Sequence, residues 1–414
     1  MPNVELMNAR TRSNMPTLLW AVILASVARM TAFVRQRGGA EFTEIDTSAM
    51  VGIGLVALCL LLLLASGNIG PTWRRVARTS GGLLVAYYIL CAASALWSPL
   101  PEYTLFTSVE MAGLMLAVFV ALSYCGSFAQ AERRVMLVCV LTILLGMLVN
   151  VRFYGVTASL ANWHTNSYSA SAAMLSCYAV GEYLSRGKEL PRAVKWAGGA
   201  GLVALALGTS SASTIAALGG FAVAAFVLRR WGLVFGGLAA AALVVALGFG
   251  GQFMTNILFP GKTEGQIATL HGRIQLWTAY AEDVKQSPLF GNGFGVSARL
   301  SSFRYTTNPH NAVFSVLLGT GAAGMLVVLG ALLRLTRESW LASKLRRPGA
   351  TGATAAIAAG LANSMALPVI GDQWMAPSAV FAALLALHVL FVVGTDNAYA
   401  DEPLPNLSAN LLHS

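Results

Sequence analysis

The apolar residues of this chain occur in long blocks, most of them about 17–24 residues, and this feature limits the possible folds most strongly. A helix that crosses the hydrocarbon core of a bilayer needs about 20 apolar residues, because it rises about 1.5 Å per residue. Only 11% of the residues are charged and 56% are hydrophobic, whereas a soluble domain carries roughly 25% charged residues. The pattern therefore predicts an all-α, polytopic membrane protein and excludes soluble domains in series, a coiled coil and a disordered chain.

We expect about 12 transmembrane helices in a single integral membrane domain that covers residues 1–414. The first block contains Arg29, but no convincing cleavage site follows it, so we interpret it as an anchor. The predicted spans cover residues 15–34, 49–66, 81–97, 105–124, 135–151, 167–184, 196–208, 211–228, 231–250, 311–334, 352–370 and 377–394.

The positive charges favour one orientation of these spans. With the N-terminus inside, 18 of the 27 Lys and Arg residues fall in cytoplasmic connections and 8 fall outside. An excess of Lys and Arg marks cytoplasmic loops, so both termini are predicted to be cytoplasmic. The same scattered distribution, without interleaved aromatic residues, argues against nucleic acid as the partner of the +10 net charge. The five cysteines lie in or at the ends of apolar blocks and lack CxxC spacing, which indicates core residues rather than disulfides or a zinc site.

One connection is much longer than the others. Residues 251–310 form a predicted periplasmic loop of about 60 residues between spans 9 and 10, and long ordered loops are usually functional. Within it, residues 270–285 place Ile274, Trp277, Ala281 and Val284 on one helical face. This predicts a short amphipathic helix, ended by Pro288, that lies on the membrane surface or on the helix bundle.

The sequence Gly-Asn-Gly-Phe-Gly at residues 291–295 invites a nucleotide-binding interpretation, which we reject. A phosphate-binding glycine loop needs a strand before it and a helix after it, and this loop is predicted to face a compartment without ATP. We interpret it as a tight turn that returns the chain to the membrane.

His310 is the histidine best placed for chemistry. It follows Asn308 and Pro309 directly before an apolar span, and Asn and Pro favour the N-cap and the first position of a helix. We therefore expect His310 in the first helical turn, where the positive end of the helix dipole keeps the imidazole neutral. A neutral histidine at the membrane boundary can accept a proton or orient a hydroxyl group, although it can also serve only to start the helix. His164 is a weaker candidate in another outer loop.

The outer connections also carry several arginines. An arginine fork binds phosphate oxygens in a bidentate manner and stays charged, which suits the headgroup of a phosphorylated lipid. For each arginine alone, contact with lipid headgroups is the simpler interpretation. The candidates are Arg152, Arg273, Arg299 and Arg304.

Two blocks of the sequence resemble the O-antigen ligase and polymerase superfamily. HGRIQLWTAYAEDVKQSPLFGNGFG is similar to a signature with Gly-Arg, Leu-Trp and Pro-Leu-x-Gly-x-Gly-x-Gly, and PHNAVFSVLLGTGAAG is similar to a second one that begins with His-Asn. The block TNSYSASAAML resembles a looser Asn-Pro-Asn segment through Asn166. Two departures are Phe314, where leucine is usual, and GTSSAST, which lacks an arginine that many members have there. Arg152, Arg299 or Arg304 would then complete the anion site.

The resemblance implies a GT-C-like glycosyltransferase of the lipopolysaccharide ligase branch. Such an enzyme transfers O-antigen polysaccharide from undecaprenyl diphosphate to a sugar hydroxyl of lipid A–core, at the periplasmic face of a Gram-negative inner membrane, without a metal cofactor and with inversion. It implies that His310 activates the acceptor, that Arg273 and other loop arginines hold the diphosphate, and that Asn311 and Asn166 line the substrate site. The alternatives are an O-antigen polymerase with the same donor, a lipid or polysaccharide transporter, and a metal-dependent glycosyltransferase that uses Glu41, Glu44 or Asp46.

Overall fold

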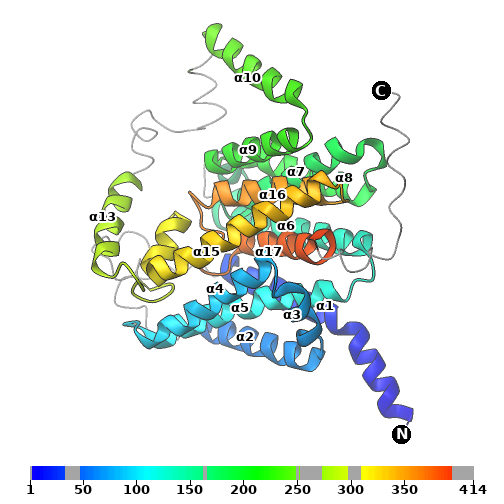
Figure 1. Ribbon diagram of the computed structural model, residues 1–414, viewed down its shortest axis with the longest axis vertical. Coiled ribbons are helices and arrows are strands. Elements are labelled where there is room, and N and C mark those ends of the chain that lie inside the picture. Colours follow the sequence, from blue (N-terminus) through cyan, green and yellow to red (C-terminus); the bar gives the residue numbers. More distant parts are fainter. Residues whose placement is uncertain are drawn as a thin grey trace.

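The computed structural model describes residues 2–32, 47–161, 166–248, 251, 273–296 and 309–393. These residues form fourteen α-helices and no β-strand, so the predicted all-α fold is confirmed (Figure 1). Each of the twelve predicted spans overlaps one of these helices. They are α1 (Pro2–Ala32), α2 (Thr47–Ser66), α4 (Ser80–Ala93), α5 (Pro101–Ser123), α6 (Phe128–Ala161), α7 (Asn166–Arg186), α8 (Arg192–Leu207), α9 (Ser211–Val227), α10 (Trp231–Ala246), α15 (Ala312–Lys344), α16 (Ala350–Asn363) and α17 (Ala376–Leu387).

Fewer helices than predicted are long enough to cross a membrane by themselves. In the part of the chain that the structure describes, five helices are long and apolar enough to cross a membrane: α2, α5, α6, α15 and α17 with its π-helical end His388–Val393. A sixth span arises if α3 (Ile69–Val76) and α4 with its 3₁₀ end count as one, although they are bent by 111°. Helices α4, α8, α9, α10 and α16 have 14 to 17 residues, about 21–26 Å against a hydrocarbon core of about 30 Å. The chain is therefore a polytopic membrane protein, and twelve spans remain a proposal.

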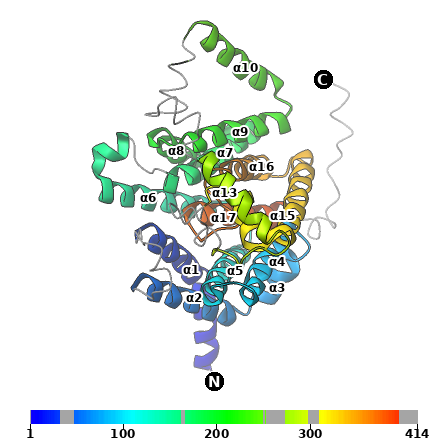
Figure 2. The ribbon, with the colours of Figure 1, turned by 90° about the vertical axis from the view of Figure 1, so that its left-hand side faces the viewer.

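Small residues bring the central helices close together. A Cβ atom on Gly181 of α7 would lie 3.0 Å from the Cα atom of Gly352 on α16, and one on Gly220 of α9 would lie 2.8 Å from the carbonyl oxygen of Ala355. Close backbone approach of this kind is how helices associate where no water drives them together. Helix α17 is buried along its whole length beside these helices, and all five cysteines are buried and unbridged, as predicted. Helix α10, in contrast, has no buried residue and stands apart from the bundle (Figures 1 and 2).

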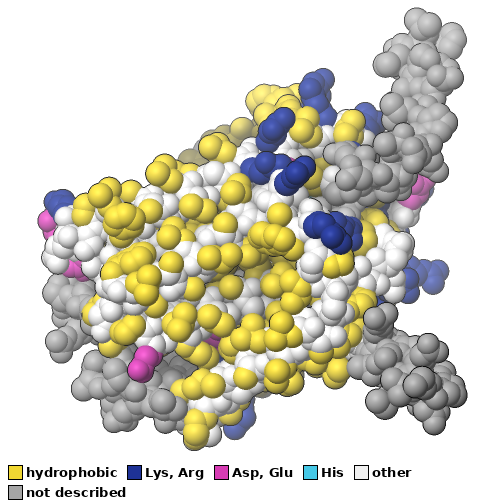
Figure 3. Space-filling model, turned by 60° about the horizontal axis from the view of Figure 1, so that its bottom comes forward, with side chains coloured by type: hydrophobic (Ala, Val, Ile, Leu, Met, Phe, Trp, Pro, Cys, Tyr) yellow, Lys and Arg dark blue, Asp and Glu magenta, His cyan; other side chains and the backbone are white. Residues whose placement is uncertain are grey.

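The outer surface has the distribution of side chains that a bilayer favours. Hydrophobic side chains are spread over the face in Figure 3, and most of the Lys and Arg side chains in view lie toward one end of it. Exposed leucines and valines on α2, such as Leu61 at 63% and Leu64 at 72%, belong to this lipid-compatible surface.

Several ionisable residues inside the bundle are paired or hydrogen-bonded. Arg29 of α1 forms an ion pair with Glu110 of α5, and both side chains are buried. The Glu338 carboxylate of α15 accepts hydrogen bonds from the backbone N–H and the hydroxyl group of Ser80, the first residue of α4. A buried charge is tolerated when it is paired and hydrogen-bonded.

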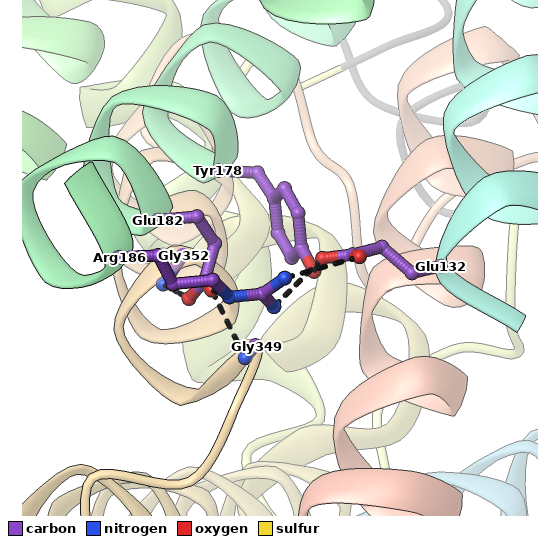
Figure 4. Close-up of polar contacts among 6 residues, drawn as sticks. All are labelled: Glu132, Tyr178, Glu182, Arg186, Gly349 and Gly352. Carbon is purple, nitrogen blue, oxygen red and sulfur yellow. Dashed lines mark hydrogen bonds and ion pairs between the residues drawn. The ribbon is translucent and has the colours of Figure 1, made fainter. Parts of the chain in front are cut away.

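The largest of these clusters joins α6, α7 and the start of α16 (Figure 4). Glu132 accepts a hydrogen bond from the Tyr178 hydroxyl at 2.7 Å and another from the Arg186 guanidinium at 2.9 Å. Glu182, paired with Arg186, accepts the backbone N–H groups of Gly349 at 3.0 Å and Gly352 at 2.8 Å. Gly349 is the N-cap of α16 and has no side chain to cap it, so Glu182 from another helix satisfies these donors instead.

One predicted span is shorter than expected. Helix α16 ends at Asn363, not at residue 370, and residues 364–375 continue without helical structure although most of them are buried. Pro368 and Gly371, which has φ 86°, prevent a helix here. Irregular backbone is tolerated at this depth only where protein surrounds it, and this segment packs against the first turn of α15.

Candidate functional site

The loop helix α13 (Arg273–Gln286) packs on the start of α15, which lies beside it in both ribbon views (Figures 1 and 2). Leu276 and Tyr280 are buried against Leu318, separately from the main core. The predicted helix is confirmed, and of the two predicted locations it takes the one on the bundle. The predicted face is wrong in part: Trp277 and Val284 do pack inward, but Ile274 is 48% exposed. The contact with α15 buries the face of α13 that carries Leu276 and Tyr280. Helical spacing alone does not distinguish this face from the adjacent one that carries Ile274.

The glycine loop, residues 288–296, forms the predicted tight turn. Gly291, Gly293 and Gly295 all have positive φ angles, of 64°, 101° and 73°, which favour glycine. The loop bonds through its backbone to α15: Asn292 N–H donates to the Leu318 carbonyl at 2.8 Å and Gly293 N–H to the Gly319 carbonyl at 2.9 Å. Its N–H groups are therefore used within the protein and do not form a phosphate cradle.

Helix α15 is broken where this loop meets it. Gly321 has φ 62° and ψ −157°, so the helical hydrogen bonds are interrupted there. The glycine loop satisfies the donors that the break releases, because Ala322 N–H donates to the Pro288 carbonyl at 2.8 Å and Ala323 N–H to the Leu289 carbonyl at 3.0 Å. The glycine loop and the break thus form one hydrogen-bonded unit that holds the N-terminal part of α15, residues 312–321.

Replacing Gly321 by alanine is expected to destabilise this unit by about 2–5 kcal/mol, from a disfavoured positive φ and from overlap with the loop backbone. A Cβ atom at position 321 would overlap the backbone of Leu289 and Phe290. Gly330 on the same helix is the matched control, because no described atom lies within 4 Å of its Cβ position. Gly330→Ala should be neutral or stabilise, and thermal unfolding of the two purified variants measures the difference. Equal unfolding temperatures would contradict the assigned packing.

His310 lies in a tight turn just before α15 rather than in its first helical turn. The N-cap of α15 is Asn311, whose side-chain oxygen accepts the Val313 N–H at 2.9 Å. The prediction that Asn308 caps this helix and that His310 lies inside it is therefore wrong by three residues. Two asparagines, Asn308 and Asn311, flank Pro309 and His310, and either could cap a helix by residue type. The helix starts after the second one, where Ala312 N–H donates to the Ser364 carbonyl at 2.8 Å. His310 has φ 52°, which is uncommon for a residue with a side chain.

Residues 364–375 pack against the start of α15, which directly follows this turn. A Cβ atom on Gly371 would lie 2.9 Å from Cγ2 of Val316 and 3.4 Å from Cβ of Ser315, so residues 364–375 lie against the first turn of α15. The neighbouring Asp372 is buried, and the Gln373 amide donates to the Tyr103 hydroxyl at 2.6 Å. Neither Gln373 nor Tyr103 was among the predicted site residues. Pro368 and Gly371, which disfavour a helix, are the sequence signal that this segment leaves the helix and folds inward.

Arg273 is the first residue of α13 and is partly buried. Burial lowers the pKa of its guanidinium, but from a value so high that the group keeps its charge at neutral pH. It lies one helical turn before Trp277, whose indole N–H donates to the Pro309 carbonyl at 3.2 Å. The structure thereby brings the helix that carries Arg273 to the His310 turn. On the same helix, burial raises the pKa of Asp283, while Glu282 points outward to Lys285 at 2.7 Å.

The remaining predicted site residues are Asn311, Arg152, Asn166, Arg299 and Arg304. Asn311 lies at the site as the helix cap. Arg152 is exposed on α6 and forms no hydrogen bond or ion pair among the described residues, and Asn166 is the first residue of α7. Arg299 and Arg304 lie outside the described residues, as do His164 and the acids Glu41, Glu44 and Asp46.

The part of the chain that holds this site matches a known family. Residues 196–329 match the family model described as O-antigen ligase. The chain contains an O-antigen ligase domain. This O-antigen ligase domain runs from α8 into α15 and includes α13, the glycine loop and His310, so the resemblance of the two sequence blocks is confirmed. No curated protein matches the chain.

Proposed function

We propose that this protein is an O-antigen ligase that transfers polysaccharide from undecaprenyl diphosphate to a sugar hydroxyl of lipid A–core. The domain indicates an enzyme of the O-antigen ligase and polymerase family, and the specific reaction is our inference. The observation that supports it most is the convergence on one turn: His310, in a strained backbone conformation, lies beside the helix that begins with Arg273. Strained residues of this kind cluster at functional sites.

The proposed mechanism assigns one role to each of these two residues. His310 accepts or orients the proton of the acceptor hydroxyl, whose oxygen attacks the anomeric carbon of the donor. The bond from that carbon to the diphosphate oxygen breaks, and undecaprenyl diphosphate leaves as an anion that Arg273 stabilises. Arg152, Arg299 and Arg304 are proposed to assist with the charge, and Asn166 with the glycan. A one-step displacement inverts the anomeric carbon.

The direct test is transfer in vitro between purified lipid-linked glycan and purified lipid A–core, catalysed by the full chain in detergent or lipid vesicles. Polysaccharide on lipid A–core is the expected product. If the glycan grows on its lipid carrier and does not reach lipid A–core, the protein is a polymerase. In a deletion strain, core without polymer indicates a ligase, and core with one repeat unit indicates a polymerase.

A transporter is less consistent with the buried charges. Transport through a bundle uses charged residues at mid-membrane that face a pathway. Arg29 and Glu110, which lie well within predicted spans, are paired with each other inside the bundle. Their pairing favours a structural role.

We expect transfer to continue in the presence of EDTA, because arginines are proposed to neutralise the diphosphate. Among the described residues, no three His, Cys, Asp or Glu side chains are close enough to hold a metal ion together. Glu41, Glu44 and Asp46 should each tolerate replacement by alanine. Transfer that stops on chelation and returns with magnesium or manganese would instead support the metal-dependent alternative.

The proposed location is the inner membrane of a Gram-negative bacterium, with twelve spans and with residues 251–310 in the periplasm. Because Lys and Arg favour the cytoplasmic connections, a fluorescent protein fused after Ser414 should be fluorescent in the cytoplasm. Alkaline phosphatase inserted at Lys262 should be active in the periplasm. Alkaline phosphatase and fluorescent protein fusions measure this. Opposite behaviour at either position would rule out the twelve-span topology.

A further inference from the structure

The backbone of His310 needs support from its surroundings. Its φ of 52° is in the left-handed region, which is unfavourable for a residue with a Cβ atom. Such a conformation persists only where neighbouring contacts hold it. After His310, the Asn311 cap and the hydrogen bond from Ala312 N–H to the Ser364 carbonyl supply that support.

Before His310, the support comes from α13. The indole N–H of Trp277 donates to the carbonyl oxygen of Pro309, the residue directly before the histidine, at 3.2 Å. The bond joins residues 32 positions apart and is partly buried. A hydrogen bond to this carbonyl restricts rotation of the peptide unit that links Pro309 to His310, and so restricts φ of His310.

Trp277 also contacts the chain after His310. Its ring stacks on Phe314, with ring centroids 6.3 Å apart and an interplanar angle of 27°. One side chain therefore contacts the chain on both sides of the histidine. The stacking fixes the plane of the indole, and that plane directs the N–H toward Pro309. A second indole acts similarly on the glycine loop, since Trp97 N–H donates to the Phe290 carbonyl at 3.1 Å.

We propose that Trp277 is a positioning residue that holds the His310 backbone in its strained conformation and couples it to the helix that carries Arg273. The inference rests on the proposed function, because its main readout is glycan transfer. Trp277 does not react itself; it acts through His310. Its removal should slow the chemical step more than it weakens substrate binding.

The test compares Trp277→Phe with wild type in the full purified chain. Phenylalanine keeps an aromatic ring on Phe314 but has no N–H for the Pro309 carbonyl. Since a single hydrogen bond contributes about 1 kcal/mol net, we expect kcat to fall about three- to tenfold. The KM values for lipid-linked glycan and for lipid A–core should change less than twofold, and the unfolding temperature should stay close to that of wild type. Trp196→Phe is the control, because Trp196 is in the same domain and is 80% exposed.

A double variant separates positioning from general damage to the fold. His310→Gln should retain measurable residual transfer, and adding Trp277→Phe to it should cause no further loss if Trp277 acts through His310. Three results would overturn the inference: wild-type kcat in Trp277→Phe, a loss confined to KM, or an equal further loss in the His310→Gln background.

The outcomes also separate this inference from the proposed function. If wild type transfers glycan, His310→Ala does not, and Trp277→Phe equals wild type, only the positioning role is wrong. If wild-type protein transfers no glycan to lipid A–core, the proposed function is wrong, and the positioning role of Trp277 in that reaction is wrong as well.

Discussion

Replacing His310 by alanine is expected to reduce glycan transfer by about 10²–10⁴-fold, the usual contribution of a positioned general base. The protein should still insert and fold, because the Asn311 cap and the Ala312 hydrogen bond do not use the imidazole. Arg273→Lys should also be impaired, since lysine keeps the charge but loses the bidentate fork. Initial rates of transfer with purified protein measure both effects.

Three controls make this result specific. His164→Ala and His413→Ala should remain largely active. His310→Gly should be as inactive as His310→Ala but more stable by about 1 kcal/mol, because glycine adopts a positive φ without strain. A His310→Ala protein that transfers glycan at nearly the wild-type rate would show that the proposed mechanism is wrong.

Replacing Glu182 by glutamine is expected to destabilise the protein by about 3–5 kcal/mol, the typical cost of breaking a buried ion pair from one side. The carboxylate is 1% exposed, pairs with Arg186 and accepts the N–H groups of Gly349 and Gly352 (Figure 4). Glutamine has one acceptor oxygen and an NH₂ group, so it cannot serve both backbone donors and the guanidinium together. Thermal or denaturant unfolding of the purified variant measures the loss.

Glu282→Gln is the matched control for this change. Glu282 also pairs with a cation, Lys285 at 2.7 Å, but the two side chains are 63% and 69% exposed. Exposed pairs contribute little, so its unfolding free energy should change by less than about 0.5 kcal/mol. The same small change in Glu182→Gln would mean that Glu182 does not hold the start of α16.

The positions of the helices could be predicted from sequence. Apolar blocks of membrane-spanning length have few alternatives to a helix, because every backbone polar group must find its partner within the same segment. The turn at Gly291, Gly293 and Gly295 was also predictable, since these glycines adopt φ angles that other residues avoid. The motifs around Arg273 and His310 further identified the domain that residues 196–329 form.

The geometry of the site depended on contacts between segments far apart in sequence. Helical spacing allows more than one inward face on α13, and only packing against Leu318 and Phe314 selects the one with Leu276 and Tyr280. Asn308 and Asn311 are equally good N-caps by residue type. Helix α15 starts after Asn311, where Ala312 N–H donates to the Ser364 carbonyl. Likewise, the sequence shows Glu182 only as a charged residue near the end of a predicted span. Its role depends on Gly349, 167 residues later, whose N–H donates to its carboxylate.

The sequence alone determined where most of the helices form and which residues we propose for the chemistry, because hydrophobicity and backbone preference act over a few neighbouring residues. The tertiary structure decided which face of α13 is buried, which residue caps α15 and what holds His310 at φ 52°. Those outcomes depend on donors, acceptors and apolar surfaces that come together only when distant helices pack.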